Sequence, residues 1–201
     1  MKAPTTTVLA IVLVLASALA GCSKTVSWQE EVTLNTGETI WVKRTVGYVL
    51  KGGGDNPLDI AYRADWKERL EFTWREGKYV YQGEALVFVL AISPRNQPTL
   101  VARASDKNWE VRNMYQCTKP SYVQMTPGID GRTWSWPPAI ESWLYGLPAN
   151  LMLNRGKPEE MKKRYLTQDQ ASADAIVRAQ CPSLARIDPT FIFTQDCKGR
   201  V

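Results

Sequence analysis

The chain has 201 residues, of which 25 are Lys or Arg and 20 are Asp or Glu, so its net charge is +5. A positive surplus of that size is ordinary for a globular domain and does not indicate nucleic-acid binding. The sequence contains no histidine, which excludes Ser-His and Cys-His catalytic pairs and every zinc site that needs a histidine ligand. We therefore expect no nucleic-acid partner, no metal and no other cofactor.

The chain opens with the pattern of a secretory signal peptide. Lys2 is followed by an apolar run over residues 8–19, interrupted only by Ser17. This run makes about 18 Å of helix, whereas a bilayer core needs about 20 residues, so it is too short for a permanent span. A basic start, a short apolar core and small residues at the end are typical of a signal removed after export.

The end of this segment, Leu19-Ala20-Gly21-Cys22, resembles the bacterial lipobox. The resemblance implies cleavage after Gly21, acylation of the Cys22 thiol and anchoring of the chain by its lipid. In such lipoproteins an Asp after the cysteine tends to retain the protein in the inner membrane. Ser23 stands there, so the resemblance implies the outer membrane, with the domain facing the periplasm. The alternative is an ordinary signal peptide, or a buried helix, with a chance cysteine.

The length of the remaining chain suits one domain. We expect residues 1–21 to be the signal peptide, residues 22–26 to form a lipidated tether and residues 27–201 to form a single domain. Removal of the signal peptide takes away Lys2 alone among the charged residues and leaves a net charge of +4.

A β-hairpin is predicted over residues 28–44, because two alternating segments flank Asn35-Thr36-Gly37. A three-residue loop with glycine in the left-handed region is a common hairpin closure. The predicted register pairs Val32 with Ile40, Glu30 with Val42, and Trp28 with Arg44. The apolar side chains then share one face, and Glu30 is expected to pair with Arg44. Glu30 and Glu31 face opposite sides and cannot serve as a glycosidase acid/base pair.

Further elements are predicted along the chain. Residues 46–66 contain a glycine triplet and little periodicity, so we expect mostly loop. A second hairpin is predicted with Glu76-Gly77 as its turn, which pairs Trp74 with Tyr79 and Phe72 with Tyr81. More strands are predicted at residues 85–93, 99–104, 109–117 and 122–126.

Helical signals begin only after Pro137-Pro138. Four apolar residues fall on one face of a short predicted helix: Ile140, Trp143, Leu144 and Leu147. Two more helices are predicted, over residues 158–164 and over residues 167–180, where Pro182 would end the second. The predicted class is therefore α+β, with an antiparallel sheet in residues 27–126 followed by short C-terminal helices.

Three cysteines remain besides Cys22. The periplasm is oxidising, which favours one disulfide. A Cys181–Cys197 bond closes a loop of about 15 residues and contributes roughly 3 kcal/mol in the chain-entropy model. Cys117 would then be a small buried apolar residue, although the spacing also permits Cys117 to pair with either of the others.

Trp134 and Trp136 are candidate ligand-binding residues. In an extended segment residues i and i+2 point the same way, so the two indoles could form a platform for the sugar rings of peptidoglycan or another envelope polysaccharide. The alternative is that both tryptophans cover the core beneath a proline-rich loop, since large aromatic side chains mostly serve burial.

The segment from Trp28 to Arg44 is similar to the start of uncharacterised proteobacterial proteins that share a W-x-E-E-V-x-L-x-x-G-x-x-I-x-V-x-R pattern. Leu70-Glu71-Phe72-Thr73 and Leu100-Val101-Ala102 are similar to later stretches of such proteins. The resemblance spans about residues 27–105 and implies no substrate and no catalytic residue.

Together these features predict a membrane-anchored envelope lipoprotein that binds another envelope component, a protein or a polysaccharide, and is not an enzyme. The sequence lacks the G-x-S-x-G, S-x-x-K, phosphate-loop and C-x-x-C motifs. Two alternatives stay open. One is a saccharide-binding module that uses Trp134 and Trp136, and the other is a hydrolase with two carboxylates about 5–10 Å apart in a cleft.

Overall fold

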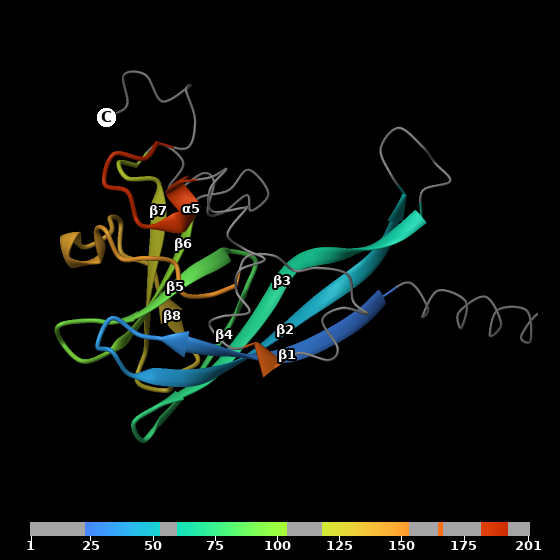
Figure 1. Cartoon of the computed structure of the whole chain (residues 1–201), viewed down its shortest axis with the longest axis horizontal. Coiled ribbons are helices and arrows are strands. Elements are labelled where there is room, and N and C mark those ends of the chain that lie inside the picture. The colour runs from blue at the N-terminus through green and yellow to red at the C-terminus, as the bar shows by residue number, and fades with distance from the viewer. Residues whose placement is uncertain (1–22, 53–59, 104–117, 153–164, 167–181, 193–201) are drawn as a thin grey trace, which may run out of the picture.

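The computed structural model of the chain describes residues 23–52, 60–103, 118–152, 165–166 and 182–192 (Figure 1). Nearly all regular structure in these residues is antiparallel β-sheet. The strands are β1 (Ser23–Thr33), β2 (Thr39–Gly52), β3 (Ile60–Trp74), β4 (Gly77–Gly83), β5 (Leu86–Ile92), β6 (Pro98–Arg103), β7 (Tyr122–Pro127), β8 (Trp134–Ser135) and β9 (Tyr165–Leu166). Helix within this part of the chain is limited to the 3-10 turn η2 (Ser142–Leu144) and the short α5 (Pro182–Ala185). Neither is long enough to cross a membrane.

The predicted α+β class is therefore wrong, and the described fold is β-rich. Sheet A has the strand order β4-β3-β2-β1-β9, and sheet B has the order β5-β6-β7-β8. In sheet A only β9 runs parallel to its neighbour, beside Gln29 and Glu30 of β1. β1 begins at Ser23, so residues 23–26 of the segment expected to form a tether are paired with β2.

The first predicted hairpin is confirmed in its register. β1 and β2 pair Val32 with Ile40, Glu30 with Val42, and Trp28 with Arg44. Gly37 closes the loop with φ of +85°, in the region that only glycine adopts at little cost. Alternation of apolar and polar residues therefore sufficed to place the first two strands, because a one-residue slip would turn every side chain to the wrong face.

The prediction of a loop over residues 46–66 is wrong for most of that segment. β2 continues to Gly52 and β3 starts at Ile60. Val46 and Tyr48 lie fully buried on the same face as Trp28. The period-2 pattern is thus present, but the glycines that follow it weaken the signal.

The β3–β4 hairpin exists, but its predicted register is displaced by two residues. Its two-residue loop is Arg75-Glu76, and Trp74 lies opposite Gly77. Arg75 takes the left-handed conformation, with φ of +52°. Gly77 lies in the strand because the ring of Tyr79 folds over it, with the phenolic oxygen only 2.7 Å from where a Cβ would stand.

The two sheets face each other across one hydrophobic core. Sheet A contributes Val32, Val42, Leu70, Phe72 and Tyr81, and sheet B contributes Val87, Leu90, Leu100, Val123 and Met125. The β5–β6 pairing is irregular between Val87 and Val89, where the extra residue Phe88 turns outward. All the predicted strands of sheet B that fall within the described residues are confirmed, whereas the strand predicted at residues 109–117 lies outside them.

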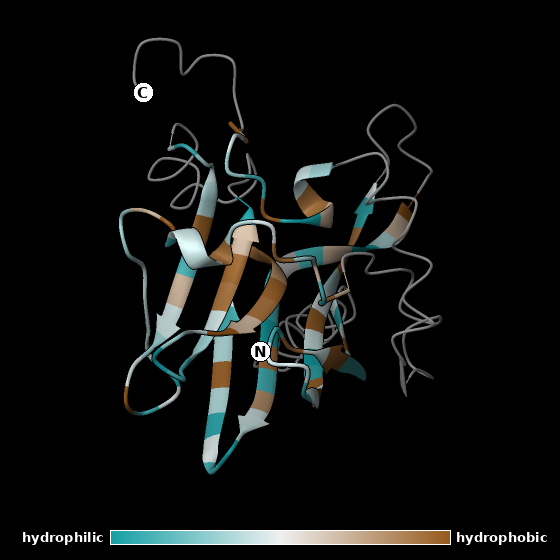
Figure 2. Ribbon diagram, turned by 60° about the vertical axis from the view of Figure 1, so that its left-hand side comes forward, coloured by the Kyte–Doolittle hydropathy of each residue, from teal (hydrophilic) through white to brown (hydrophobic). Residues whose placement is uncertain are grey.

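The outer face of sheet B is covered by a second apolar layer (Figure 2). The segment predicted to be a helix over residues 140–147 lies in this layer, but it forms only η2. Ile140 and Leu144 are buried against sheet B, so the spacing of the apolar residues reflects packing rather than helix. Gly146 has φ of +80° and Pro148 follows it, which ends the turn.

Both predicted C-terminal helices, over residues 158–164 and 167–180, lie outside the described residues. Within residues 182–192, Pro182 begins the short α5. Proline is well suited to a first helical position because its missing N–H needs no partner there. Leu184 and Ile187 then pack against the outer face of sheet B.

Candidate functional site

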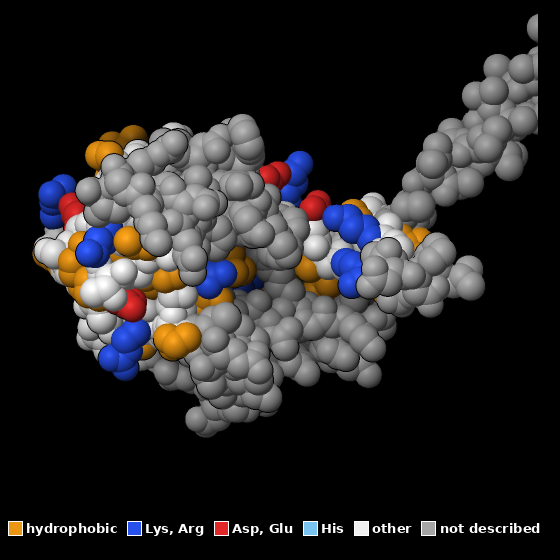
Figure 3. All heavy atoms as spheres, turned by 90° about the horizontal axis from the view of Figure 1, so that it is seen from above, with side chains coloured by type: hydrophobic (Ala, Val, Ile, Leu, Met, Phe, Trp, Pro, Cys, Tyr) orange, Lys and Arg blue, Asp and Glu red, His pale blue; other side chains and the backbone are white. Residues whose placement is uncertain are grey.

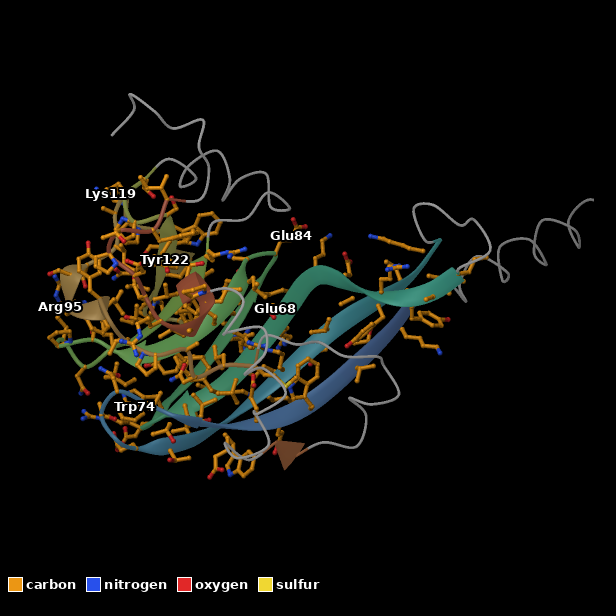
Figure 4. The ribbon with its side chains drawn as sticks, turned by 45° about the horizontal axis from the view of Figure 1, so that its top comes forward. Glu68, Trp74, Glu84, Arg95, Lys119 and Tyr122 are labelled. Carbon is orange, nitrogen blue, oxygen red and sulfur yellow. The ribbon has the colours of Figure 1, made fainter. Side chains whose placement is uncertain are left out.

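Three charged side chains meet inside the molecule. Arg44 of β2 lies between Glu30 of β1 and Glu68 of β3, whose position is shown in Figure 4. The Arg44 Nε atom is 3.3 Å from a carboxylate oxygen of Glu30 and 3.7 Å from one of Glu68. All three side chains are buried. A buried charge is tolerated only when an opposite charge and hydrogen-bond partners lie close to it. Here one cation faces two anions.

The same cluster supplies hydrogen bonds to backbone groups on the open edge of β5 and at residue 152. The Arg44 guanidinium donates to the carbonyls of Val87 and Met152. The N–H of Val87 donates to Glu68 and the N–H of Met152 donates to Glu30. These hydrogen bonds join sheet A to the start of β5 and to the backbone at Met152.

Two asparagines make further hydrogen bonds to the open edge of β5. The Asn150 side chain accepts from the N–H of Leu90 and donates to the carbonyls of Leu90 and Thr33. Asn35 likewise accepts from the N–H of Ile92 and donates to its carbonyl. Side chains therefore satisfy the backbone groups of this sheet edge, which would otherwise invite pairing with another chain.

Glu30 and Glu68 do not form the open carboxylate pair that a hydrolase needs. Both carboxylates contact Arg44, and both are enclosed between the sheets. Glu30 and Arg44 therefore have a structural role in this cluster. The diagonal Glu30–Arg44 contact was predicted from the hairpin register, whereas Glu68 came from a segment whose register was not predicted.

Trp134 and Trp136 lie beside the core. Both are partly buried and pack against the cluster between the sheets. The Trp134 indole N–H donates to the carbonyl of Val80 at 2.8 Å, and its ring meets Tyr81 edge-on, with 5.9 Å between ring centroids. Together with the hydrogen bond from the Val80 N–H to Gly131, this contact covers the open edge of β4. Their role as a sugar platform stays a prediction.

A groove on the outer face of sheet A contains an exposed tryptophan that the sequence analysis passed over. Trp41 is 48% exposed. The groove has a volume of about 540 Å³ and is lined by Gln29, Ile40, Trp41, Lys43, Glu71, Phe72, Thr73 and Lys78. The predicted hairpin register already assigned odd-numbered β2 residues to the polar face, so an aromatic residue at position 41 was a detectable signal.

The charges in this groove are fixed by ion pairs. Glu71 lies 3.2 Å from Arg69 and 3.9 Å from Lys43. The hydrogen bond from Arg69 lowers the pKa of the Glu71 carboxyl, so it is ionised at neutral pH. An exposed indole, an amide, a hydroxyl, two ammonium groups and a carboxylate are thus held on rigid strands. Such a mixture of one apolar surface and convergent polar groups is typical of a ligand site.

A smaller hollow of about 200 Å³ lies at the edge of sheet B, beside Arg95, Glu141 and Trp143. The Trp143 indole N–H donates to Glu141, and this bond is the largest cause that lowers the pKa of the Glu141 carboxyl. Gln124 and Arg95 also contact that carboxylate. Its polar groups mostly bind one another, so the hollow offers less to a ligand than the groove on sheet A.

Metal and disulfide chemistry find no support in the described part of the chain. No group of three or more acidic or cysteine side chains there could hold a metal ion. Cys22, Cys117, Cys181 and Cys197 all lie outside the described residues, so the predicted Cys181–Cys197 bond and the acylation of Cys22 stay predictions.

No protein-family model, curated protein or solved structure matches the chain. The resemblance of residues 28–44 to uncharacterised proteobacterial proteins therefore stays a prediction as well.

Proposed function

We propose that this protein is a lipoprotein of the bacterial envelope, anchored through acylated Cys22, that acts by binding an envelope component and not by catalysis. The supporting observation is the lipobox-like Leu19-Ala20-Gly21-Cys22 after a short apolar run. β1 begins directly after this sequence, and Ser23 pairs with Val49. A rigid sheet therefore starts one residue after the anchor point. The lipobox-like sequence and the Ser after Cys22 favour the periplasmic face of the outer membrane.

Mass analysis of the N-terminal peptide from the native host tests the anchor. The expected peptide begins at Cys22 and carries acyl chains, and the protein fractionates with the outer membrane. A Cys22→Ala variant should keep Met1 and lack lipid, whereas Cys117→Ala should be processed normally. Recovery of wild-type chains with an intact Met1 or an unmodified Cys22 would refute the proposal.

A second candidate function is saccharide binding, and the exposed Trp41 in its groove favours it. An indole face offers an apolar surface for the C–H groups of a sugar ring, while neighbouring amide, hydroxyl and ammonium groups can bind sugar hydroxyls. The groove volume of about 540 Å³ lies in the range of small-molecule sites. Because Trp41 stands on β2, its backbone does not have to order on binding.

Tryptophan fluorescence during titration with soluble peptidoglycan fragments tests this function. Trp41→Ala should weaken binding more than tenfold, while Trp134→Ala and Trp136→Ala should bind as the wild type does. The opposite ranking would place the ligand at Trp134 and Trp136. Absence of any saturable response in the wild-type protein would exclude saccharide binding by either surface.

A further inference from the structure

The groove on the outer face of sheet A is lined by three charged side chains whose charges do not cancel. Lys43 and Lys78 are cations, and Glu71 is an anion. The cross-strand register sets their order, because Lys43 lies opposite Glu71 on the neighbouring strand and Lys78 lies opposite Thr73. Two positive charges and one negative charge leave the lining with a net charge of +1.

The anion of the groove already has cationic partners, whereas one cation has none. Glu71 lies 3.2 Å from Arg69 and 3.9 Å from Lys43. Lys78 is exposed and makes no hydrogen bond or ion pair within the part of the chain that the structure describes. The hydrogen bond from Arg69 is the main cause that lowers the pKa of the Glu71 carboxyl, and the charge of Lys78 adds to it at longer range. The ammonium of Lys78 is therefore the group best placed to receive an anion from a ligand.

The charges beside the groove preserve the positive surplus. Arg69 stands two residues from Glu71 on the same face of β3, and Glu31 lies opposite Trp41 on β1. These two neighbours cancel, so the wider surface keeps its net charge of +1. On the face shown in Figure 3, by contrast, the described Lys and Arg side chains are scattered among hydrophobic and acidic ones.

We propose that the groove binds a sugar that carries one carboxylate, with the sugar ring against Trp41 and the carboxylate at the ammonium of Lys78. The inference rests on the proposed saccharide binding at Trp41. The residue opposite Lys78 is Thr73, and Thr73 and Trp41 come directly after and before the paired residues Phe72 and Val42. Trp41 and Lys78 thus lie in one cross-strand row, with β3 between their strands.

The spacing of this row suits a sugar ring and one substituent. Two strand spacings separate the backbone of Trp41 from that of Lys78 by about 9–10 Å. The long lysine side chain can reach along the row toward the indole. Lys78 stands on β4, at the opposite side of sheet A from β9, so the carboxylate end of the site lies at the β4 side of the groove.

One carboxylate matches the charge of the groove better than a neutral sugar or a phosphate does. A neutral sugar brings no negative charge to Lys78. A phosphate monoester carries a charge of about −1.5 to −2, which exceeds the surplus and faces Glu71 as a like charge. The guanidinium of Arg69, which has the planar geometry suited to phosphate, already donates to Glu71. A charge-assisted hydrogen bond from an ammonium to a carboxylate is about twice as strong as a neutral one.

Two pairs of matched ligands test the proposal. Peptide-free peptidoglycan strands carry the carboxylate on the lactyl group of muramic acid, and oligogalacturonides carry it on uronic acid. The methyl ester of each removes the charge and keeps the sugar. We expect the free acid of at least one pair to bind at least tenfold more tightly than its ester in titrations followed by tryptophan fluorescence at low salt, and the preferred pair identifies the source.

Two variants with the same loss of charge locate the carboxylate. Lys78→Gln should abolish the preference for the free acid and leave the affinity for the ester unchanged. Lys119→Gln is the control, because Lys119 is exposed and precedes β7 of sheet B, away from the groove (Figure 4). This control should keep the full preference.

The outcomes separate this inference from saccharide binding itself. Equal affinities for acid and ester in both pairs, with binding weakened in Trp41→Ala, overturn the carboxylate and leave the saccharide site intact. A preference that survives Lys78→Gln also overturns the inference, because the carboxylate then binds elsewhere. Absence of saturable binding by all four ligands overturns both.

Discussion

Replacing Arg44 by methionine should remove much of the folding free energy. Its guanidinium is fully buried and contacts two carboxylates and two backbone carbonyls. Removal of one partner from a buried ion pair costs about 3–5 kcal/mol, because the remaining charge is left uncompensated. Arg44→Met leaves two buried carboxylates, so we expect about 5 kcal/mol, comparable with the whole stability of a marginal domain, about 5–15 kcal/mol.

Equilibrium unfolding in urea, followed by tryptophan fluorescence, measures this loss. With an m-value of about 2 kcal/mol/M, a loss of 5 kcal/mol lowers the midpoint by about 2.5 M. The matched control is Arg95→Met, because Arg95 pairs with Glu141 at 3.7 Å while its side chain is 81% exposed. An exposed pair contributes little, so the control should change stability by less than about 0.5 kcal/mol.

A triple variant separates the cost of buried charge from the cost of lost packing. Adding Glu30→Gln and Glu68→Gln to Arg44→Met keeps acceptors for the N–H groups of Met152 and Val87 but removes both negative charges. We expect it to recover about 2 kcal/mol relative to Arg44→Met. A loss of less than about 1 kcal/mol in Arg44→Met, or a triple variant less stable than Arg44→Met, would refute a stabilising role of the buried charge cluster.

Three further predictions concern the hydrogen bonds of Asn150 and the titration of Asp130 and Tyr122. Asn150→Leu should cost about 3 kcal/mol in chemical unfolding, because it removes three hydrogen bonds that satisfy Leu90 and Thr33, and an unchanged midpoint would contradict this role. The Thr133 hydroxyl and two backbone N–H groups lower the pKa of Asp130 to about 2, so its stabilising effect is present above pH 4 and lost as the pH falls toward 2. An NMR titration should show this value, and Thr133→Ala should raise it; a pKa near 4 in the wild type would count against the loop geometry. Burial raises the pKa of the Tyr122 phenol to about 12, so stability should fall as the pH rises from 10 toward 12. Tyr122→Phe should remove that part of the alkaline loss, and an unchanged alkaline profile would show that Tyr122 does not carry it.

Local pattern determined the first hairpin completely. Alternation places Trp28, Glu30, Val32 and their partners on one face, and Gly37 permits the turn, so the register follows from nearest neighbours alone. The β3–β4 hairpin was placed but its register was not. A glycine at the turn was the stronger sequence signal, yet Gly77 lies within the strand because the Tyr79 ring packs over it.

The candidate site was only partly open to prediction. The sequence marked Trp134 and Trp136, which the fold uses to cover the core and the edge of β4, while the exposed Trp41 lies on the polar face that the register had already defined. Trp41 was missed because aromatic residues were judged by their spacing alone, without asking which face of the sheet carries them.

The sequence by itself predicted an export signal, and it determined the identity of most strands and the ion pair between Glu30 and Arg44, since these depend on short-range periodicity and composition. Only the tertiary structure decided that residues 140–147 cover sheet B without forming a helix, that Glu68 completes the buried charge cluster, and that asparagines close the β5 edge. These features join residues up to 122 positions apart, as in the hydrogen bond from the Met152 N–H to Glu30. Their free energy comes from excluding water between two sheets, which no single strand can do alone.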